Sequence, residues 1–121
     1  MKSLFLLLVI MTSINLSAQN DGDRRYAEDE LKLALAKGKP RVEGPPQVIL
    51  KDSTTAVSVA EPILFAEYGK VITMERPYKI FRLKQYYWVI MGTLPEDAMG
   101  GNFVIVLDAR DCRVLRLTHY K

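Results

Sequence analysis

The sequence contains few of the residues from which metal sites and catalytic sites are usually built. It has one histidine, His119, and one cysteine, Cys112, in 121 residues. A structural zinc site needs several His or Cys ligands, and a catalytic histidine needs a nucleophile and an orienting partner. We therefore expect no metal ion, no cofactor and no catalytic residues.

The scarcity of cysteine and the small net charge exclude two further classes of protein. A single cysteine allows no internal disulfide, so the fold must be stabilised by its hydrophobic core. The formal net charge is only +3, and Lys2 supplies one of these charges from a segment that we expect to be removed. Such a small excess does not predict a nucleic-acid partner.

Residues 1–18 differ in kind from the rest of the chain. They carry one basic residue near the start, then an apolar run from Leu4 to Met11, and they end in the small residues Ser17 and Ala18. This is the layout of a secretory signal peptide, and the run is too short for a membrane span of about 20 apolar residues. We predict cleavage after Ala18, export to the periplasm, and no membrane association afterwards.

Residues 19–48 are predicted to form an N-terminal helix and a linker rich in Gly and Pro, which precede an α+β domain at residues 49–121. Asp23 can cap a helix over residues 24–37, which Gly38 ends. Four apolar residues fall on one face at helical spacing, namely Ala27, Leu31, Ala34 and Leu35. This narrow stripe is typical of an amphipathic helix.

A longer helix is predicted over residues 53–68. Asp52 or Ser53 can cap its start, and Gly69 can end it in a left-handed conformation. A stripe at spacings of three and four is formed by Val57, Ala60, Leu64 and Tyr68. Pro62 lies inside the pattern, so the helix is either kinked there or begins there. Because the stripe stays in phase across the proline, we predict one kinked helix. The segment KVITMER that follows is predicted to form a short turn, which Pro77 closes.

From Tyr78 onward the hydrophobic period changes from 3.6 residues to two. Four runs rich in aromatic and β-branched residues predict strands at residues 78–83, 86–94, 102–109 and 113–120. Connections this short join neighbouring antiparallel strands, which predicts a meander. Both faces of the third run are apolar, as in a central strand that is covered on both sides. The predicted class is therefore α+β, with the kinked helix packed on a curved four-stranded antiparallel sheet.

Carboxylates offer an alternative, catalytic interpretation of the same sequence. Glu61 and Glu67 lie on the predicted long helix, and Asp108 and Asp111 flank a predicted hairpin. Two carboxylates that are buried close together can act as a general acid and a general base. Nothing in the sequence predicts such burial, and an Asp beside a hairpin more often accepts local backbone hydrogen bonds. We therefore favour a protein that is not an enzyme.

Aromatic and loop residues are the candidates for contacts with a partner or ligand. Alternation along a strand places Tyr86 and Trp88 on one side of the sheet and Tyr87 on the other. Core packing is the more common role for a tryptophan, and exposed tyrosines suit a protein interface. The candidate partner-binding residues are Tyr86, Tyr87, Glu96, Asp97 and Met99, and the candidate pocket residues are Trp88 and His119.

Residues 60–121 resemble the bacterial immunity proteins with the nuclear transport factor 2 fold. The similarity is carried by the segments AEPILFAEYGK, RPYKIF, YYWVIMGTLP, GGNFVIVLDARD and RVLRLTHYK, in this order. The resemblance implies a cone of antiparallel sheet wrapped round helices, as in cystatin-like folds, and a protein that neutralises a toxin by binding it. It supplies no catalytic residues.

The chain departs from the family pattern at two positions, where Cys112 and Tyr120 stand in place of glycine. A glycine in a tight hairpin usually supplies a positive φ. Because cysteine is strained in that conformation, we expect Asp111 to adopt it or the turn to shift.

Taken together, the sequence predicts an exported immunity protein that binds a cognate toxin. Since an inhibitor must meet its target, the signal peptide predicts a toxin that acts in the periplasm. The alternative is a periplasmic module that binds a small molecule on the concave face of the sheet near Trp88. The sequence leaves the oligomeric state open.

Overall fold

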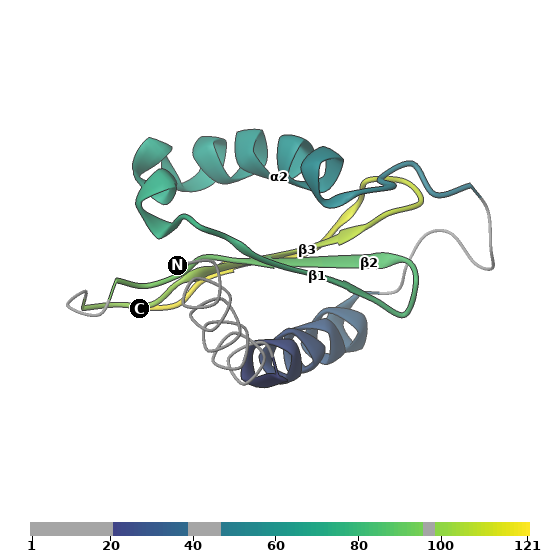
Figure 1. The fold of residues 1–121 in the computed structure, drawn as a ribbon, viewed down its shortest axis with the longest axis horizontal. Helices are drawn as coiled ribbons and strands as arrows, with labels where there is room; N and C mark the ends of the chain where they lie inside the picture. Colours follow the sequence, from purple (N-terminus) through teal and green to yellow (C-terminus); the bar gives the residue numbers. More distant parts are fainter. Residues whose placement is uncertain (1–20, 39–46, 96–98) are drawn as a thin grey trace, which may run out of the picture.

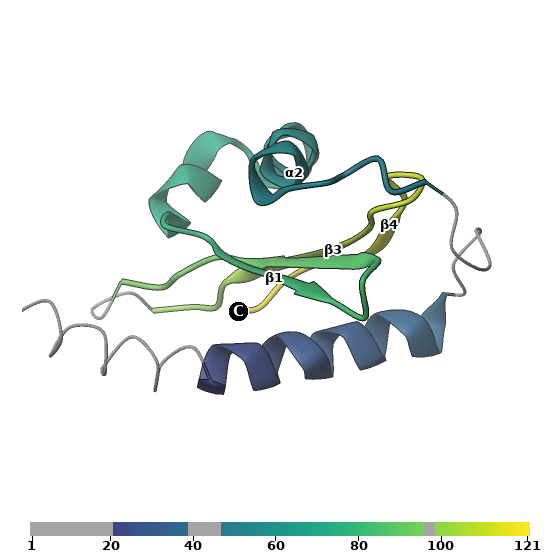
Figure 2. The same ribbon diagram turned by 45° about the vertical axis from the view of Figure 1, so that its right-hand side comes forward.

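The computed structural model describes residues 21–38, 47–95 and 99–121. In this part of the chain a four-stranded sheet lies between two helices (Figure 1). Helix α2 (Ser53–Tyr68) covers one face, and the N-terminal helix, residues 21–37, runs along the other (Figure 2). No helix among these residues is long and apolar enough to cross a membrane. Residues 1–18 and most of the Gly/Pro linker lie outside the described residues.

The sheet confirms the predicted meander of hairpins. Its strands are β1 (Lys79–Leu83), β2 (Tyr87–Met91), β3 (Phe103–Asp108) and β4 (Val114–His119). They lie in the order β1-β2-β3-β4, and every neighbouring pair is antiparallel. The α+β class and the helix on the meander are therefore as predicted.

Helix α2 also follows its prediction, because Asp52 caps it and Gly69 ends it. The Asp52 carboxylate accepts a hydrogen bond from the Thr55 amide at 2.7 Å, and Gly69 has φ of 86°. Pro62 lies inside the helix, which continues on both sides of it. The chain then turns through a short 3-10 helix, η1 (Lys70–Glu75), where the sequence had predicted only a turn.

The predicted start of the N-terminal helix is wrong. The chain is already helical at residue 21, so Asp23 lies within the helix and does not cap it. Its carboxylate instead accepts a hydrogen bond from the Lys79 ammonium at 3.0 Å, which joins the helix to β1. The end of the helix is as predicted, since the Gly38 amide donates to the Ala34 carbonyl at 3.0 Å.

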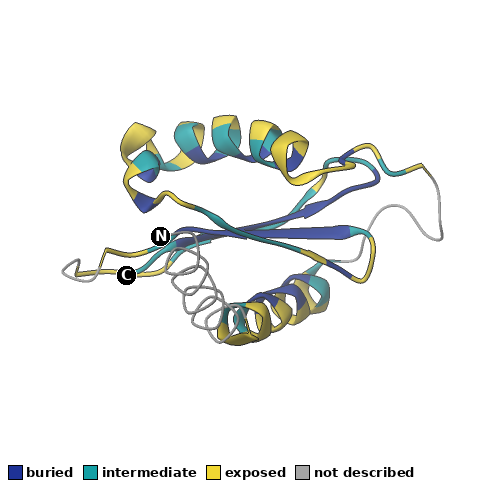
Figure 3. Ribbon diagram, in the orientation of Figure 1, coloured by how far each residue is buried: buried dark blue, intermediate teal, exposed yellow. Residues whose placement is uncertain are grey.

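Two hydrophobic cores meet on β3, which confirms that it is a central strand covered on both faces. Phe103, Ile105 and Leu107 pack in the cluster under α2. Val104 and Val106 pack in the cluster under the N-terminal helix. All of β2 and β3 is buried (Figure 3). From the predicted stripes, α2 contributes Ala60 and Leu64 as fully buried residues, and the N-terminal helix contributes Ala27, Leu31 and Ala34.

Tyr120, one of the two departures from the family pattern, attaches the N-terminal helix to the sheet. Its hydroxyl donates to the Glu30 carboxylate at 2.6 Å, and its ring lies 6.5 Å from that of Tyr26. The guanidinium of Arg116 on β4 reaches the same carboxylate at 2.6 Å. Glu30 is almost completely buried, so these two donors satisfy a carboxylate that would otherwise be costly to bury. A glycine at position 120 could not make this contact.

Cys112, the other departure, adopts the left-handed conformation itself, with φ of 62°. The expectation that Asp111 would adopt it is therefore wrong. The reason is that Asp111 closes the turn in another way, by accepting a hydrogen bond from the Arg113 amide at 3.0 Å. The Cys112 amide donates to the Asp108 carbonyl at 2.9 Å, which holds the turn in place.

Candidate functional site

The segments that carry the family resemblance meet at one end of the molecule. This end is formed by the C-terminus of α2 with η1, by the chain that leaves β2, by the residues that enter β3, and by the end of β4 (Figure 1, left). The motifs there are YGK at 68–70, GTLP at 92–95, GG at 100–101 and THYK at 118–121. Residues far apart in the sequence thus build one local structure.

Glu75, the last residue of η1, joins these segments. Its carboxylate accepts a hydrogen bond from the Phe103 amide at 2.8 Å and lies 2.9 Å from Nε2 of His119. Its backbone carbonyl accepts from the Thr93 amide at 2.7 Å. The side chain is buried, so η1 is fixed at once to the end of β2, the start of β3 and the end of β4.

Glycine is required at two positions of these motifs, because other atoms lie too close for a side chain. A Cβ on Gly92 would lie 2.3 Å from Oε1 of Glu75 and 2.9 Å from the Phe103 ring. A Cβ on Gly101 would lie 2.3 Å from the backbone of Tyr120. Side chains at these positions would therefore separate η1 or the end of β4 from the sheet.

His119 has a structural role at this end. Besides the Glu75 contact, Nδ1 lies 2.8 Å from the Tyr120 carbonyl oxygen, and the ring lies 5.5 Å from that of Tyr68 on α2. Both ring nitrogens thus face oxygen atoms of the protein. Among the described residues, no group of three or more His, Cys, Asp and Glu side chains could hold a metal ion.

Trp88 and His119 are not brought together. Trp88 pairs with Leu107 and His119 pairs with Phe103, and these partners are four residues apart on β3, roughly 13 Å. The Trp88 ring is buried in the core under α2, and its Nε1 donates to the Leu50 carbonyl at 2.8 Å.

The structure corrects the predicted placement of the tyrosines. β2 begins at Tyr87, so Tyr86 belongs to the turn and does not follow the alternation of the strand. Tyr86 packs on the same side as Tyr87, against the core under the N-terminal helix, and Trp88 faces the other side. The Arg110 guanidinium stacks over the Tyr86 ring at 4.5 Å. Tyr87 is buried and Tyr86 half-buried, so neither forms an exposed aromatic face.

The buried Arg110 that covers these rings is paired with Asp108. Its Nη2 lies 2.8 Å from one carboxylate oxygen and its Nε 2.9 Å from the other. This carboxylate raises the pKa of Arg110 above its ordinary value, although burial acts in the opposite direction. Asp108 therefore has a structural role in the hairpin, and Glu61 is paired elsewhere, with Arg76.

Exposed apolar side chains lie on two segments at the end of the molecule that Glu75 holds together. Val71 and Met74 are 62% and 70% exposed, and their spacing of three places them on one side of the 3-10 helix. Leu94 and Met99, on the chain between β2 and β3, are 38% and 100% exposed. We call these four side chains the η1 surface. Of the predicted partner-binding residues, Met99 belongs to it, whereas Glu96 and Asp97 lie outside the described residues.

Sequence reasoning missed Val71 and Met74 because the segment KVITMER was interpreted as a turn. The signal that could have identified them is the pair of apolar residues three apart in a segment too short for a core helix. Exposed apolar groups that gather in one place are typical of interaction sites.

A cluster of polar side chains fixes the chain directly after η1. The Glu61 carboxylate of α2 accepts hydrogen bonds from Arg76 at 2.5 Å and from the Tyr78 hydroxyl at 2.6 Å. The bond from Tyr78, and then the bond from Arg76, lower the pKa of Glu61 below its ordinary value of 4.5. These contacts hold the start of β1 against α2.

We expect Glu61 to make stability depend on pH in acid. Because its pKa is lower in the folded than in the unfolded protein, its contribution is complete above pH 4.5 and is lost as the pH falls through the folded pKa. The melting temperature of the native protein should therefore exceed that of Glu61→Gln above pH 4.5, and the gap should narrow below it. Calorimetry of both proteins from pH 3 to 7 measures this gap, and a constant gap would contradict the assignment.

Comparison with known proteins identifies the family. The profile of the family described as "NTF2 fold immunity protein" matches residues 55–121, which include all but the first two residues of α2, and also η1 and all four strands. The chain belongs to this family, and its membership supports an immunity function. The recognition made from the motifs is thereby confirmed.

A curated relative is also similar to the chain, and its name states no function. The chain is 33% identical over 75 residues to the uncharacterized protein YhhH of Escherichia coli strain K12. The match covers 60% of this chain and 58% of the relative, so the chain spans little more than half of that protein. No solved structure matches the chain.

Proposed function

We propose that this protein is an exported immunity protein that neutralises a cognate toxin in the periplasm by binding it through the η1 surface. The toxin acts there, for example on the cell wall. The protein inhibits by occupying a surface of the toxin and carries out no reaction itself.

The observation that carries this proposal is the convergence of the family motifs on the η1 surface. The carboxylate of Glu75 and the close approaches at Gly92 and Gly101 fix η1 to the sheet at that end, and the side chains of Val71 and Met74 remain exposed on it. A rigid apolar surface binds at a low entropic cost, because little must be ordered on association. Export is supported by the composition of residues 1–18, since a toxin acting in the cytosol would need its antidote there.

We propose no second function, because nothing favours the small-molecule module on the sheet. That interpretation needed an open concave face near Trp88. The face that carries Trp88 is packed under α2, and the Trp88 indole is bonded to the Leu50 carbonyl.

The proposal is tested by coexpressing the full chain with the product of the neighbouring toxin gene directed to the periplasm. Cells should survive with the full chain and die with a version that lacks residues 1–18, because the latter would stay in the cytosol. Survival that does not depend on this protein would refute the immunity function, and equal protection by both versions would refute export.

A further inference from the structure

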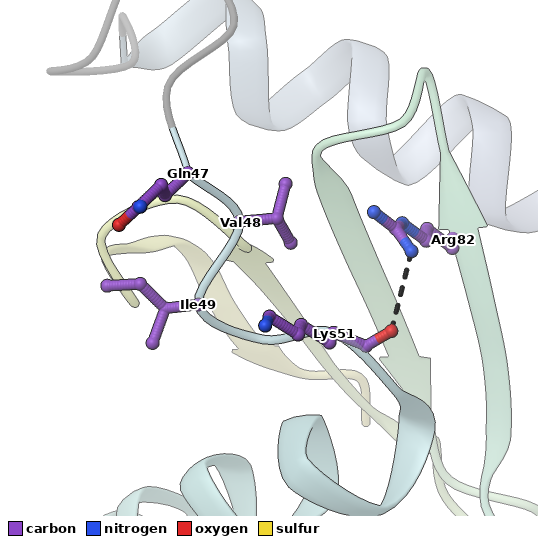
Figure 4. Close-up of a pocket in the computed structure, with 5 residues that line it drawn as sticks. All are labelled: Gln47, Val48, Ile49, Lys51 and Arg82. Carbon is purple, nitrogen blue, oxygen red and sulfur yellow. Dashed lines mark hydrogen bonds between the residues drawn. The ribbon is translucent and has the colours of Figure 1, made fainter.

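A row of hollows lies between β1 and residues 47–61, which lead into α2 and form its first half. The first, of about 490 Å³, is lined by Arg82, Lys51 and the chain at residues 47–49 (Figure 4). The second lies between Ile80 and the first turns of α2. The third lies between Tyr78, Ile80 and the middle of α2. We call this row the β1 groove.

The spacing of the hollows is that of alternate residues in a strand. Tyr78, Ile80 and Arg82 are two residues apart and face the α2 side, where Tyr78 and Ile80 pack on the core and Arg82 lies over the Trp88 ring. Each step of two residues covers roughly 7 Å. The hollows therefore match the side-chain repeat of an extended peptide lying beside β1.

β1 is an edge strand, and its outer side pairs with no other strand in the described part of the chain. The unpaired amide and carbonyl groups of an edge strand can pair with a strand from another protein. Main-chain hydrogen bonds then supply affinity, and hollows for alternate side chains supply specificity.

The charge of the groove indicates what it can bind. Arg76 and Lys79 are paired with Glu61 and Asp23, but no carboxylate among the described residues pairs with Lys51 or Arg82. Within the described ranges, the Arg82 guanidinium donates to the carbonyl oxygens of Gln85 and Lys51 and to no other acceptor. One end of the groove thus offers two cations to an acidic side chain.

We propose that β1 binds an extended segment of the toxin by strand addition. An acidic side chain of that segment contacts Lys51 and Arg82, and an apolar one fills the hollow at Ile80. This inference rests on the proposed function and extends the η1 surface, because η1 leads into β1 through only three residues, Arg76, Pro77 and Tyr78. A stable interface buries about 800 Å² of surface on each partner. The four side chains of the η1 surface do not supply this area by themselves, and the β1 groove adds to it.

The test measures amide hydrogen exchange of the full chain, free and bound to the purified toxin. We expect slower exchange in residues 79–83 of the complex, because their outward amides become bonded to the toxin segment. Exchange that slows in η1 while residues 79–83 exchange as in the free protein would overturn the strand addition and leave the immunity function standing. Absence of any complex would refute the proposed function as well, so the two failures are distinguishable.

A charge reversal tests the acidic contact separately. Lys51→Glu should weaken toxin binding tenfold or more, because the exposed ammonium is replaced by a carboxylate facing an acidic segment. Lys37→Glu makes the same change on the N-terminal helix and should leave the affinity unchanged. Equal affinities of both variants and the native protein in a titration at low salt would overturn the acidic contact.

Discussion

Replacing Val71 and Met74 together with glutamate should weaken toxin binding about 30-fold or more, the effect of losing at least one hot spot. Both side chains are mostly exposed, so the free protein should lose little stability. In the complex, however, two carboxylates would have to be buried in an apolar contact. Titration of the purified toxin measures the affinity, and calorimetry measures the melting temperature.

The matched control is Leu33→Glu, which places a carboxylate on the N-terminal helix at a residue that is 44% exposed. It should keep both the affinity and the protection of cells. Native affinity in the double variant, with the fold intact, would exclude the η1 surface as the binding site. Equal losses in the control and in the double variant would show a general effect of added negative charge.

Replacing Gly92 with alanine should destabilise the protein by about 1–3 kcal/mol through overpacking. The new Cβ would lie 2.8 Å from the Cβ of Glu75 and 2.9 Å from the Phe103 ring, so Glu75 would have to move. The buried Phe103 amide would then lose its acceptor, at a further cost of about 1–3 kcal/mol. Urea unfolding measures the change in the free energy of unfolding. Toxin binding should weaken too, because η1 loses its anchor.

Gly22→Ala is the control for this prediction. Gly22 lies in the N-terminal helix, and a Cβ there would meet nothing within 4 Å. Alanine should therefore stabilise the protein by about 0.5–1 kcal/mol, because it has the higher helix propensity. If the Gly92→Ala protein were as stable as the native one, the position of the Glu75 side chain would not contribute to stability.

The two surfaces proposed here follow from one arrangement of η1. The buried Glu75 side chain fixes the end of η1 against the sheet. The Glu61 carboxylate of α2 fixes Arg76 and Tyr78, which follow η1. The short helix can therefore expose Val71 and Met74 without the support of a longer element. The same arrangement sets the start of β1 and hence the position of its free edge.

Local pattern was enough to predict most elements of the fold. The cap at Asp52, the stop at Gly69 and the alternation along β3 depend on neighbouring residues only, so they can be deduced from sequence. The errors at Asp23 and Tyr86 arose where a distant contact or a turn overrides the local preference. Asp23 is paired with Lys79, 56 residues away, and Tyr86 is held by its turn and by Arg110.

The candidate site was much less predictable than the fold. Met99 was identified as an exposed loop residue, but Val71 and Met74 were not, because exposure depends on what packs against a segment. The two predicted pocket residues turned out to lie apart, since strand register alone decides which residues meet.

By itself, the sequence determined the α+β class, the meander, the long helix with its caps and the family, because periodicity, capping residues and motif order are properties of neighbouring residues. Only the tertiary structure decided that the motifs meet at one end, that Glu75 is buried there, and that β1 is the edge strand of the described sheet, beside α2. These features depend on contacts between residues far apart in the chain, and no local pattern encodes them.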